Sequence, residues 1–288
     1  LESPATKSFI ESSTKKVHDI VSELLGKPQP REKLTDISKL GFNEHSVRTV
    51  WPQLNQLTVA SKKIEDEELR IDFLSRYVQI LAQDGIDKDL GLERLVDFLK
   101  ATRAKASFYS LFINEPNIIR DLARLFSISP YLGQILSSRP ELIDSFLYGL
   151  QPEPPEEIEP FLDFAAEKKL LNEIYAALAL IEQSSVSSVC ERLSEVADQI
   201  TISLLDKITL EYGGAAIDIL ALGKWGSEEL GLRSDLDFIF VSGAQTISSD
   251  EQKIARKFVS LLTAAQKGGA IYAIDLRLRP SGKAGPII

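Results

Sequence analysis

Two aspartates separated by one residue, Asp235 and Asp237, stand in the alternating stretch SDLDFIFVSG. Successive side chains of a strand point to opposite faces, so this spacing places both carboxylates on one face and Leu236 and Phe238 on the other. Carboxylates held so close repel each other unless a cation lies beside them. Mg²⁺ prefers oxygen ligands, typically one or two carboxylates and the phosphates of a substrate. The pair therefore predicts a divalent-metal site, although acidic pairs also occur on the solvated face of edge strands without any ion.

A third carboxylate occurs in a later strand-like segment, AIDLRLRP, whose alternation puts Asp275, Arg277 and Arg279 on one face. An aspartate beside two arginines suits a metal and anion site, and it equally suits an Asp–Arg ladder on the surface. If Asp275 joins the pair, three carboxylates could hold two Mg²⁺ ions. Two such ions would clamp the attacking and leaving oxygens of a phosphoryl displacement.

The turn ahead of the paired aspartates carries groups that suit phosphate. Gly226 allows close backbone approach, and N–H groups together with the Ser227 hydroxyl can hold phosphate oxygens. Lys224, Arg233 and Lys283 lie in or near the same turns and could neutralise a polyphosphate. No G-x-x-x-x-G-K-[ST] motif occurs, and the glycines form no dinucleotide fingerprint. The pattern indicates a nucleoside triphosphate held by carboxylate-bound metal.

The segments ahead of these strands are predicted to be helices. Apolar residues at helical spacing predict a helix over DEELRIDFLSRYVQILAQDG that stops at Gly85, continued by helix over LERLVDFLKATRAKASFYSLF. SPYLGQILSSRPELIDSFLYG predicts two short helices, the second starting around Pro140. Residues 161–184 and 186–212 predict two long helices, and Gly213 ends the second. The first part of the chain is therefore predicted to be all-α.

Beyond residue 212 the pattern changes to strand, turn, strand, helix, strand. AAIDILALG, SDLDFIFVSG and GAIYAIDLRLRP are the predicted strands, and SDEQKIARKFVSLLTAAQKGG is the helix, stopped by its glycines. The predicted fold is α+β and mostly helical, with a helical N-terminal body followed by a small mixed-sheet core. We expect a helical domain over 1–150, an acidic Pro-rich linker over 151–160, and a second domain over 161–288. In that domain, long helices cover 161–212 and an α/β core covers 213–288.

Composition excludes several classes of protein. The 288 residues contain no apolar run near the ~20 residues that cross a bilayer, and the start lacks a signal-peptide layout. The single Cys190 excludes an internal disulfide framework and suits the cytoplasm. His18 and His45 are too few and too distant for a His-based metal site or triad. A net charge of -9 argues against nucleic acid as a partner, and the absence of Met predicts that the chain is a fragment.

ALGKWGSEELGLRSDLDFIFV together with AIDLRLRPSGKAGPII resembles the glutamine synthetase adenylyltransferase family, within the nucleotidyltransferase superfamily that includes DNA polymerase β. That family has G-K-[LW]-G-[GS]-x-E-L-x-x-x-S-D-[LI]-D-[LF]-[IV]-F and later D-x-R-L-R-P-x-G. Ser227 stands where the family often has a second glycine. The segments LGFNEHSVRTVW and LARLFSISPYLGQILSSRPELIDSF are similar to the helices ahead of the family's second catalytic unit. The resemblance covers roughly residues 40–288.

The resemblance implies a nucleotidyltransferase core that is truncated at its C-terminus, since the family continues with further helices. It implies transfer of AMP from ATP to a tyrosine of glutamine synthetase, under control of a PII-class signalling protein. The family's other unit removes the AMP by phosphorolysis. The helical prelude, SDLDF and RPSG favour the adenylylating unit, whereas the terminal GPI favours the deadenylylating one. A regulatory or docking module with a vestigial nucleotide site is the alternative from a different class.

The resemblance also assigns roles. Asp235 and Asp237 would bind both Mg²⁺ ions, and Asp275 would bind the ion at the tyrosine oxygen and accept its proton. Gly226 and Ser227 would hold the β- and γ-phosphates. Arg277 and Arg279 would contact phosphate or fix Asp275.

Overall fold

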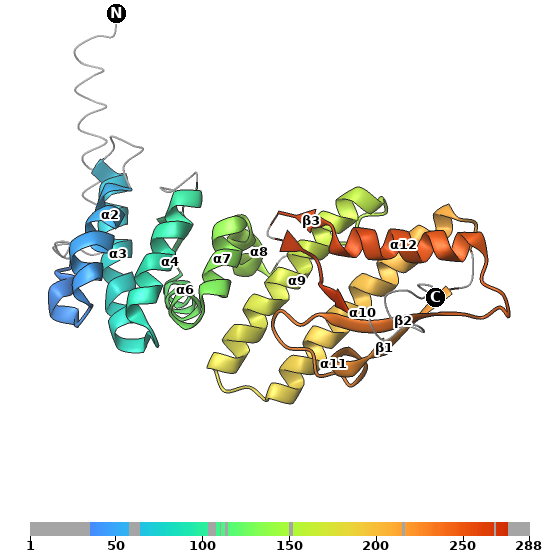
Figure 1. Cartoon of the computed structure of the whole chain (residues 1–288). Coiled ribbons are helices and arrows are strands. Elements are labelled where there is room, and N and C mark those ends of the chain that lie inside the picture. Colours follow the sequence, from blue (N-terminus) through green and yellow to red (C-terminus); the bar gives the residue numbers. More distant parts are fainter. Residues whose placement is uncertain are drawn as a thin grey trace, which may run out of the picture.

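The computed structural model describes residues 35–57, 64–102, 108–109, 111–112, 115–149, 152–214, 217–267 and 269–275. In these ranges the chain is mostly helical, and a small mixed sheet follows the helices (Figure 1). The predicted α+β class is confirmed. None of the described helices is long and apolar enough to cross a membrane.

The first part of the chain is built from short and medium helices, as the sequence predicts. Their bounds are η1 Ile37–Leu40, η2 Ser46–Val50, α2 Trp51–Gln56, α3 Ile64–Asp84, α4 Lys88–Ala101, α6 Pro116–Ile128, α7 Pro130–Ser138 and α8 Leu142–Tyr148. Side-chain caps set three of the starts. Asp36 accepts a hydrogen bond from Ser38 N–H at the head of η1, Asp87 accepts one from Leu90 N–H at the head of α4, and Ser129 accepts one from Tyr131 N–H at the head of α7. We call η1 to α8 the helical body.

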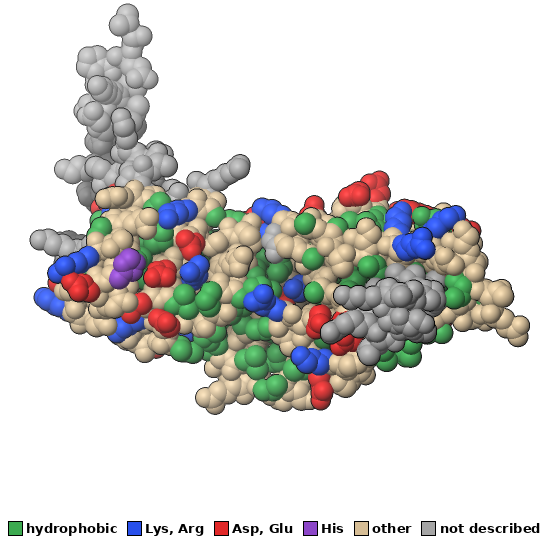
Figure 2. All heavy atoms as spheres, viewed as in Figure 1, with side chains coloured by type: hydrophobic (Ala, Val, Ile, Leu, Met, Phe, Trp, Pro, Cys, Tyr) green, Lys and Arg blue, Asp and Glu red, His purple; other side chains and the backbone are tan. Residues whose placement is uncertain are grey.

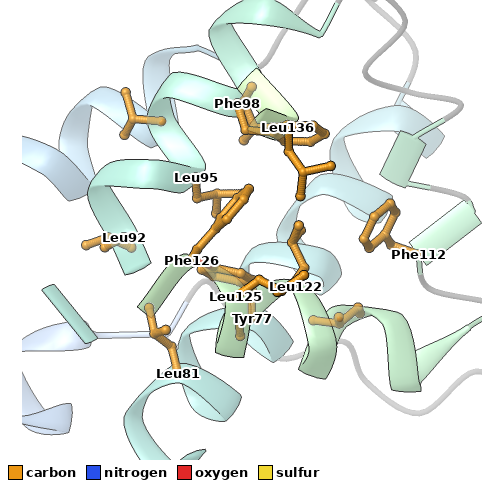
Figure 3. Packing of buried hydrophobic residues seen from close by; sticks show 14 of the residues in the cluster. Tyr77, Leu81, Leu92, Leu95, Phe98, Phe112, Leu122, Leu125, Phe126 and Leu136 are labelled. Atoms are coloured by element: carbon orange, nitrogen blue, oxygen red, sulfur yellow. The ribbon is translucent and has the colours of Figure 1, made fainter. Parts of the chain in front are cut away.

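The helical body has its own apolar core, in which aromatic rings from several helices meet (Figure 3). Phe98 of α4 and Phe126 of α6 are fully buried, with ring centroids 5.8 Å apart. Tyr77 of α3 is fully buried as well, and its hydroxyl donates to the Gly91 carbonyl at 2.8 Å. Burial of three large rings with the one polar group satisfied explains why these helices pack as one layer.

Two long helices follow, α9 Ile158–Ile181 and α10 Val186–Glu211. In Figure 1 α9 stands between the helical body and the sheet region. Its residues Leu170 and Ile174 are buried in the core of the helical body, whereas Phe161 and Ala165 are buried in a second core with α10 and the sheet. α9 is therefore a wall shared by both cores.

The start of α9 differs from the prediction. The acidic Pro-rich linker is predicted over 151–160, but the helix begins at Ile158 and takes Pro160 into its first turn. The N–H groups of a first helical turn have no acceptor inside the helix, so a proline there costs no hydrogen bond.

The sheet has three strands in the order β1-β2-β5, and the connection from β2 to β5 contains α12, β3 and β4. The elements are β1 Ile217–Leu222, α11 Gly223–Gly226, β2 Leu236–Ser242, α12 Ser249–Thr263, β3 Ala265–Gln266, β4 Gly269–Ala270 and β5 Ile274–Asp275. β1 pairs with β2 antiparallel, and β2 pairs with β5 parallel. β3 and β4 form a separate two-stranded ladder.

One face of the sheet is closed by apolar packing. Leu236, Phe238 and Phe240 of β2 are buried, in alternation with less buried positions. The Phe238 ring makes edge contacts with Phe240 and with Phe258 of α12, at centroid distances of 5.2 and 5.9 Å. The opposite face of β2 is therefore free for polar side chains, as the sequence predicts.

Two boundaries of this region were predicted wrongly. The helix predicted over SDEQKIARKFVSLLTAAQKGG ends at Thr263, and the strand predicted over GAIYAIDLRLRP is divided between β4 and β5. Ile271 and Tyr272 lie between these strands and are buried, and Tyr272 N–H donates to the Leu262 carbonyl at 3.3 Å. Burial of these side chains against the end of α12 takes their backbone out of the ladder. The rest of that predicted strand lies outside the described residues.

Candidate metal centre

Three carboxylates converge at one edge of the sheet. Ligand oxygens of Asp235, Asp237 and Asp275 all lie within 4.8 Å of one another. Asp237 is in β2 and Asp275 is in β5, whereas Asp235 immediately precedes β2. Asp235 is exposed and the other two are half-buried.

The strand register explains the convergence. In the parallel pair, Asp237 lies opposite Asp275 and Leu236 lies opposite Ile274. Register partners point to the same face, so the two aspartates share the polar face while Leu236 is fully buried beneath them. Leu236 N–H also donates to the Ala273 carbonyl at 2.9 Å, which extends the pairing to the end that carries Asp235.

The trio fits a small hard cation. Mg²⁺ binds oxygens at about 2.1 Å, so two oxygens on one ion are at most about 4 Å apart. A separation of up to 4.8 Å is reduced to that value by small side-chain rotations. The donors are all carboxylate oxygens, the type that Mg²⁺ prefers over nitrogen or sulfur.

The backbone of Gly223 lies directly against this site. Gly223 begins α11 with φ +55, and a Cβ at this position would be 2.6 Å from Asp237 Oδ2. Glycine is thus required both by the left-handed backbone and by the carboxylate. The sequence interpretation did not include Gly223 among the site residues, although its place at the end of a strand and ahead of the Lys-Trp-Gly turn was a usable signal.

The α11 turn is held against α10 and β2 by the side chain of Trp225. Trp225 is buried, and its Nε1–H donates to Asp198 Oδ1 of α10 at 2.8 Å. Its ring meets the edge of Phe238 at a centroid distance of 5.8 Å. A Cβ on Gly226 would lie 2.6 Å from the Ala221 carbonyl oxygen, so this glycine lets the turn pack on β1.

The polar groups of the α11 turn make contacts that differ from those predicted from the sequence. Ser227 N–H donates to the Gly223 carbonyl at 3.1 Å, and the single proton of the Ser227 hydroxyl has two acceptors at 3.0 Å, the same carbonyl and Glu229 Oε2. Both groups are used within the turn instead of being open to phosphate. Lys224 is exposed, and its ammonium makes no ion pair with the described residues.

Arg233, also assigned to polyphosphate from the sequence, lies on the side of the trio that faces the helical body. Its guanidinium carbon is 4.8 Å from the centroid of the Tyr131 ring, a cation–π contact. Its backbone has φ +59, and its N–H donates to Glu173 Oε1 at 2.8 Å. The Tyr131 hydroxyl donates to the other carboxylate oxygen of Glu173.

Tyr131 is a proton donor in this contact at neutral pH. Burial, and then the Glu173 carboxylate, raise the pKa of the Tyr131 hydroxyl well above its ordinary value. Sequence reasoning found neither Tyr131 nor Glu173. No local pattern indicated Glu173, because other carboxylates of α9, such as Asp163, are exposed.

Three predicted site residues lie outside the described residues: Arg277, Arg279 and Lys283. On the face of the molecule shown in Figure 2, acidic and basic side chains are interspersed among the described residues. That distribution differs from the continuous basic surface of a general nucleic-acid binder.

The family model and the curated relatives that this chain resembles have matching descriptions. Residues 170–288 match the family model of glutamate-ammonia ligase adenylyltransferase. A bifunctional glutamine synthetase adenylyltransferase/adenylyl-removing enzyme of Idiomarina loihiensis is 28% identical over 84% of this chain and 30% of its own length. Proteins of the same name from Methylococcus capsulatus and Acinetobacter baylyi are 28% and 24% identical over 68% and 100% of this chain.

The chain spans about a third of the length of these curated relatives, with shares of 30%, 26% and 37%. The segment that matches the family model contains all three aspartates of the trio and the α11 turn. The similarity of residues 170–288 to the glutamate-ammonia ligase adenylyltransferase family therefore includes all three aspartates of the candidate metal centre.

Proposed function

We propose that this chain is an adenylyltransferase that moves AMP from ATP to a tyrosine of glutamine synthetase. The observation that carries the proposal is the convergence of Asp235, Asp237 and Asp275 within 4.8 Å. The names of the relatives supply the substrate, because each is a glutamine synthetase adenylyltransferase/adenylyl-removing enzyme.

The trio would hold two Mg²⁺ ions. Asp235 and Asp237 would contact both ions, and Asp275 would contact the one nearer the tyrosine. When bound, the ions would offset the charge of the triphosphate and favour ionisation of a hydroxyl whose ordinary pKa is near ~10. The close backbone of Gly223 restricts Asp237 to its place in the trio, since the carboxylate cannot move toward α11.

In the proposed reaction the tyrosine oxygen attacks the α-phosphorus of ATP. The new oxygen–phosphorus bond forms as the bond to the bridging oxygen breaks, and pyrophosphate leaves with that electron pair. Asp275 accepts the proton of the tyrosine hydroxyl on a carboxylate oxygen. Asp275 is half-buried at the short strand β5, where its position is set by the register with β2.

The α11 turn would face the β- and γ-phosphates. Gly226, Ser227 and Lys224 are exposed there, and the Ser227 hydroxyl would exchange its contact with Glu229 for a phosphate oxygen. Arg277 and Arg279 are proposed, by resemblance alone, to contact phosphate or to fix Asp275.

Removal of AMP is the second candidate function, because the relatives are named for both activities. The same trio would serve it, with phosphate attacking adenylyl-tyrosine and ADP as the product. In either case we propose a PII-class signalling protein as the regulatory partner and the cytoplasm as the location. The helices ahead of the sheet, which resemble the prelude to the adenylylating unit, favour AMP addition.

A pair of parallel assays tests the proposal. The chain is incubated with α-³²P-labelled ATP, Mg²⁺ and unmodified glutamine synthetase, and separately with adenylylated glutamine synthetase and phosphate. Label on glutamine synthetase supports AMP addition, and ADP in the second assay supports AMP removal. If neither product forms although circular dichroism shows that the chain is folded, both activities are contradicted. The docking-module alternative then remains.

A further inference from the structure

Asp235 is positioned differently from the other two acids of the trio. Asp237 and Asp275 are held inside paired strands, whereas Asp235 follows a loop that runs from Leu230 to Ser234. The strand pairing between β2 and β5 holds the backbones of Asp237 and Asp275 in place. Contacts of the loop must therefore fix the backbone that delivers Asp235.

Three hydrogen bonds hold the loop, two of them to other helices and one within the loop. Leu230 N–H donates to the Ser194 hydroxyl of α10 at 3.3 Å. Within the loop, Gly231 N–H donates to Ser234 Oγ at 3.0 Å. The third anchor is Glu173 of α9, which accepts from Arg233 N–H at 2.8 Å, two residues before Asp235.

Glu173 is buried to 2% exposure and is shared by three elements. Besides Arg233 N–H it accepts from the Tyr131 hydroxyl of α7, and Lys169 of α9 lies 3.2 Å from its Oε1. The carboxylate thus has a donor on each oxygen and a neighbouring cation, which offsets the cost of burying it. Tyr131 also contacts the loop through its ring, beneath the Arg233 guanidinium.

We propose that Glu173 is a positioning residue for Asp235 and that it ties the metal centre to the helical body through Tyr131. The proposal rests on the function of the trio as a metal centre. Arg233 adopts φ +59, a conformation that a non-glycine residue leaves unless its surroundings hold it. The Glu173 hydrogen bond supplies that constraint, and its loss lets the backbone relax and carries Asp235 out of the trio.

The consequence is a route by which the helical body controls the metal centre. α7 and the loop share one buried carboxylate, so a displacement of α7 acts on Asp235 and leaves the strand-held pair in place. Removal of a residue that orients a metal ligand typically lowers metal affinity 10–100-fold. We expect a loss of about tenfold in affinity, which is greatest for the ion that only Asp235 and Asp237 would hold.

Mn²⁺ titration of the full chain, followed by electron paramagnetic resonance, tests the proposal. Glu173→Ala should weaken Mn²⁺ binding about tenfold. Glu173→Gln keeps an oxygen for Arg233 N–H and should retain most of the affinity, although both variants lose the charge beside Lys169. Tyr131→Phe should weaken binding by a few-fold, because the hydroxyl that aligns Glu173 is removed.

Tyr175→Phe is the matched control. Tyr175 is also on α9, and its hydroxyl donates to the Phe146 carbonyl at 3.4 Å, away from the loop. Mn²⁺ affinity should be unchanged in this variant. Thermal unfolding by circular dichroism separates general destabilisation, which both glutamate variants share, from the affinity loss expected of Glu173→Ala alone.

The outcomes separate this inference from the proposed function. If the unsubstituted chain binds no Mn²⁺, the metal centre itself is wrong. If it binds Mn²⁺ and Glu173→Ala binds with the same affinity while remaining folded, the positioning role is wrong. Equal losses in Glu173→Ala and Glu173→Gln would also overturn it, because the hydrogen-bond acceptor for Arg233 would then not matter.

Discussion

Asp237 of β2 and Asp275 of β5 are register partners in a parallel strand pair, 38 positions apart in the chain and on the same face of the sheet. β5 contributes only Ile274 and Asp275 to that pairing. This short ladder is nevertheless enough to place both aspartates on one face. Leu236 is fully buried opposite Ile274, and its burial sets which side chains point outward. The polar face of the sheet is thus determined by the apolar packing beneath it.

Asp237→Asn should abolish AMP transfer while the protein remains folded. The amide is isosteric but supplies one neutral oxygen in place of a carboxylate in the trio, so several kcal/mol of charge stabilisation are lost. We expect at least a ~100-fold fall in label transfer to glutamine synthetase, since ~1.4 kcal/mol corresponds to a factor of ten. Asp218→Asn, an exposed acid on β1, is the control and should transfer AMP at the original rate. Equal activity in both variants would remove the metal-centre account.

Gly223→Ala should damage the site more than the fold. The new Cβ would lie 2.6 Å from Asp237 Oδ2, and φ +55 is unfavourable for alanine by about 1–2 kcal/mol. Mn²⁺ affinity should fall at least tenfold, measured by titration, because the carboxylate must rotate away. Gly243→Ala, where no atom lies within 4 Å of the added Cβ, should bind Mn²⁺ as before. An unaffected Gly223→Ala protein would show that Asp237 is not held by this contact.

Phe238→Ala should be strongly destabilising. Phe238 is fully buried and its ring meets those of Trp225, Phe240 and Phe258. Loss of such a ring costs about 3–5 kcal/mol, measured by urea unfolding. Val241→Ala on the same strand is 41% exposed and should cost no more than about 0.5 kcal/mol. Similar costs at the two positions would contradict the assignment of the buried face.

Glu251 should make stability depend on pH in the acid range. Hydrogen bonds from the Ser242 hydroxyl, and then from Ser248 N–H, lower the pKa of Glu251 below its ordinary 4.5. A lowered folded pKa contributes stability that is present above the unfolded pKa and is lost as the pH falls through the folded one. Glu251→Gln should therefore melt below the unsubstituted protein at pH 7, and the gap should narrow as the pH falls below the ordinary pKa of 4.5 and through the lowered one.

Asp250→Asn provides the comparison for this pH series, because Asp250 is exposed in the same first turn of α12. Its melting difference should be small at both pH values. A gap for Glu251→Gln that stays constant from pH 7 to pH 3 would mean that the carboxylate charge contributes nothing to the capping of α12.

Much of the architecture could be predicted because it depends on short-range patterns. The stripe of α10 and the alternation of β2 each occupy one continuous segment, so burial of one face follows from spacing alone. The meeting of Asp237 with Asp275 required only that the last strand lie beside β2. The boundaries were less predictable: Ile271 and Tyr272 turn inward against α12 and interrupt a strand that the alternation extends without a break.

The parts of the site that sequence reasoning missed depend on contacts between distant segments. Glu173 lies 60 positions from Arg233, and nothing in either local pattern indicates that one accepts from the other's backbone. Gly223 is explained only by the approach of Asp237, 14 residues later. The domain division at 151–160 stays a prediction, and α9 contributes to the cores on both sides of it.

The central claim is that the three aspartates hold divalent metal against a triphosphate. It is tested most directly by diffraction from crystals of the chain soaked with Mn²⁺ and a non-hydrolysable ATP analogue, with data collected at the manganese edge. We predict anomalous peaks bounded by Asp235, Asp237 and Asp275, with the triphosphate extending toward Ser227. A fully occupied analogue bound elsewhere, with no anomalous peak between the three carboxylates, would contradict the account.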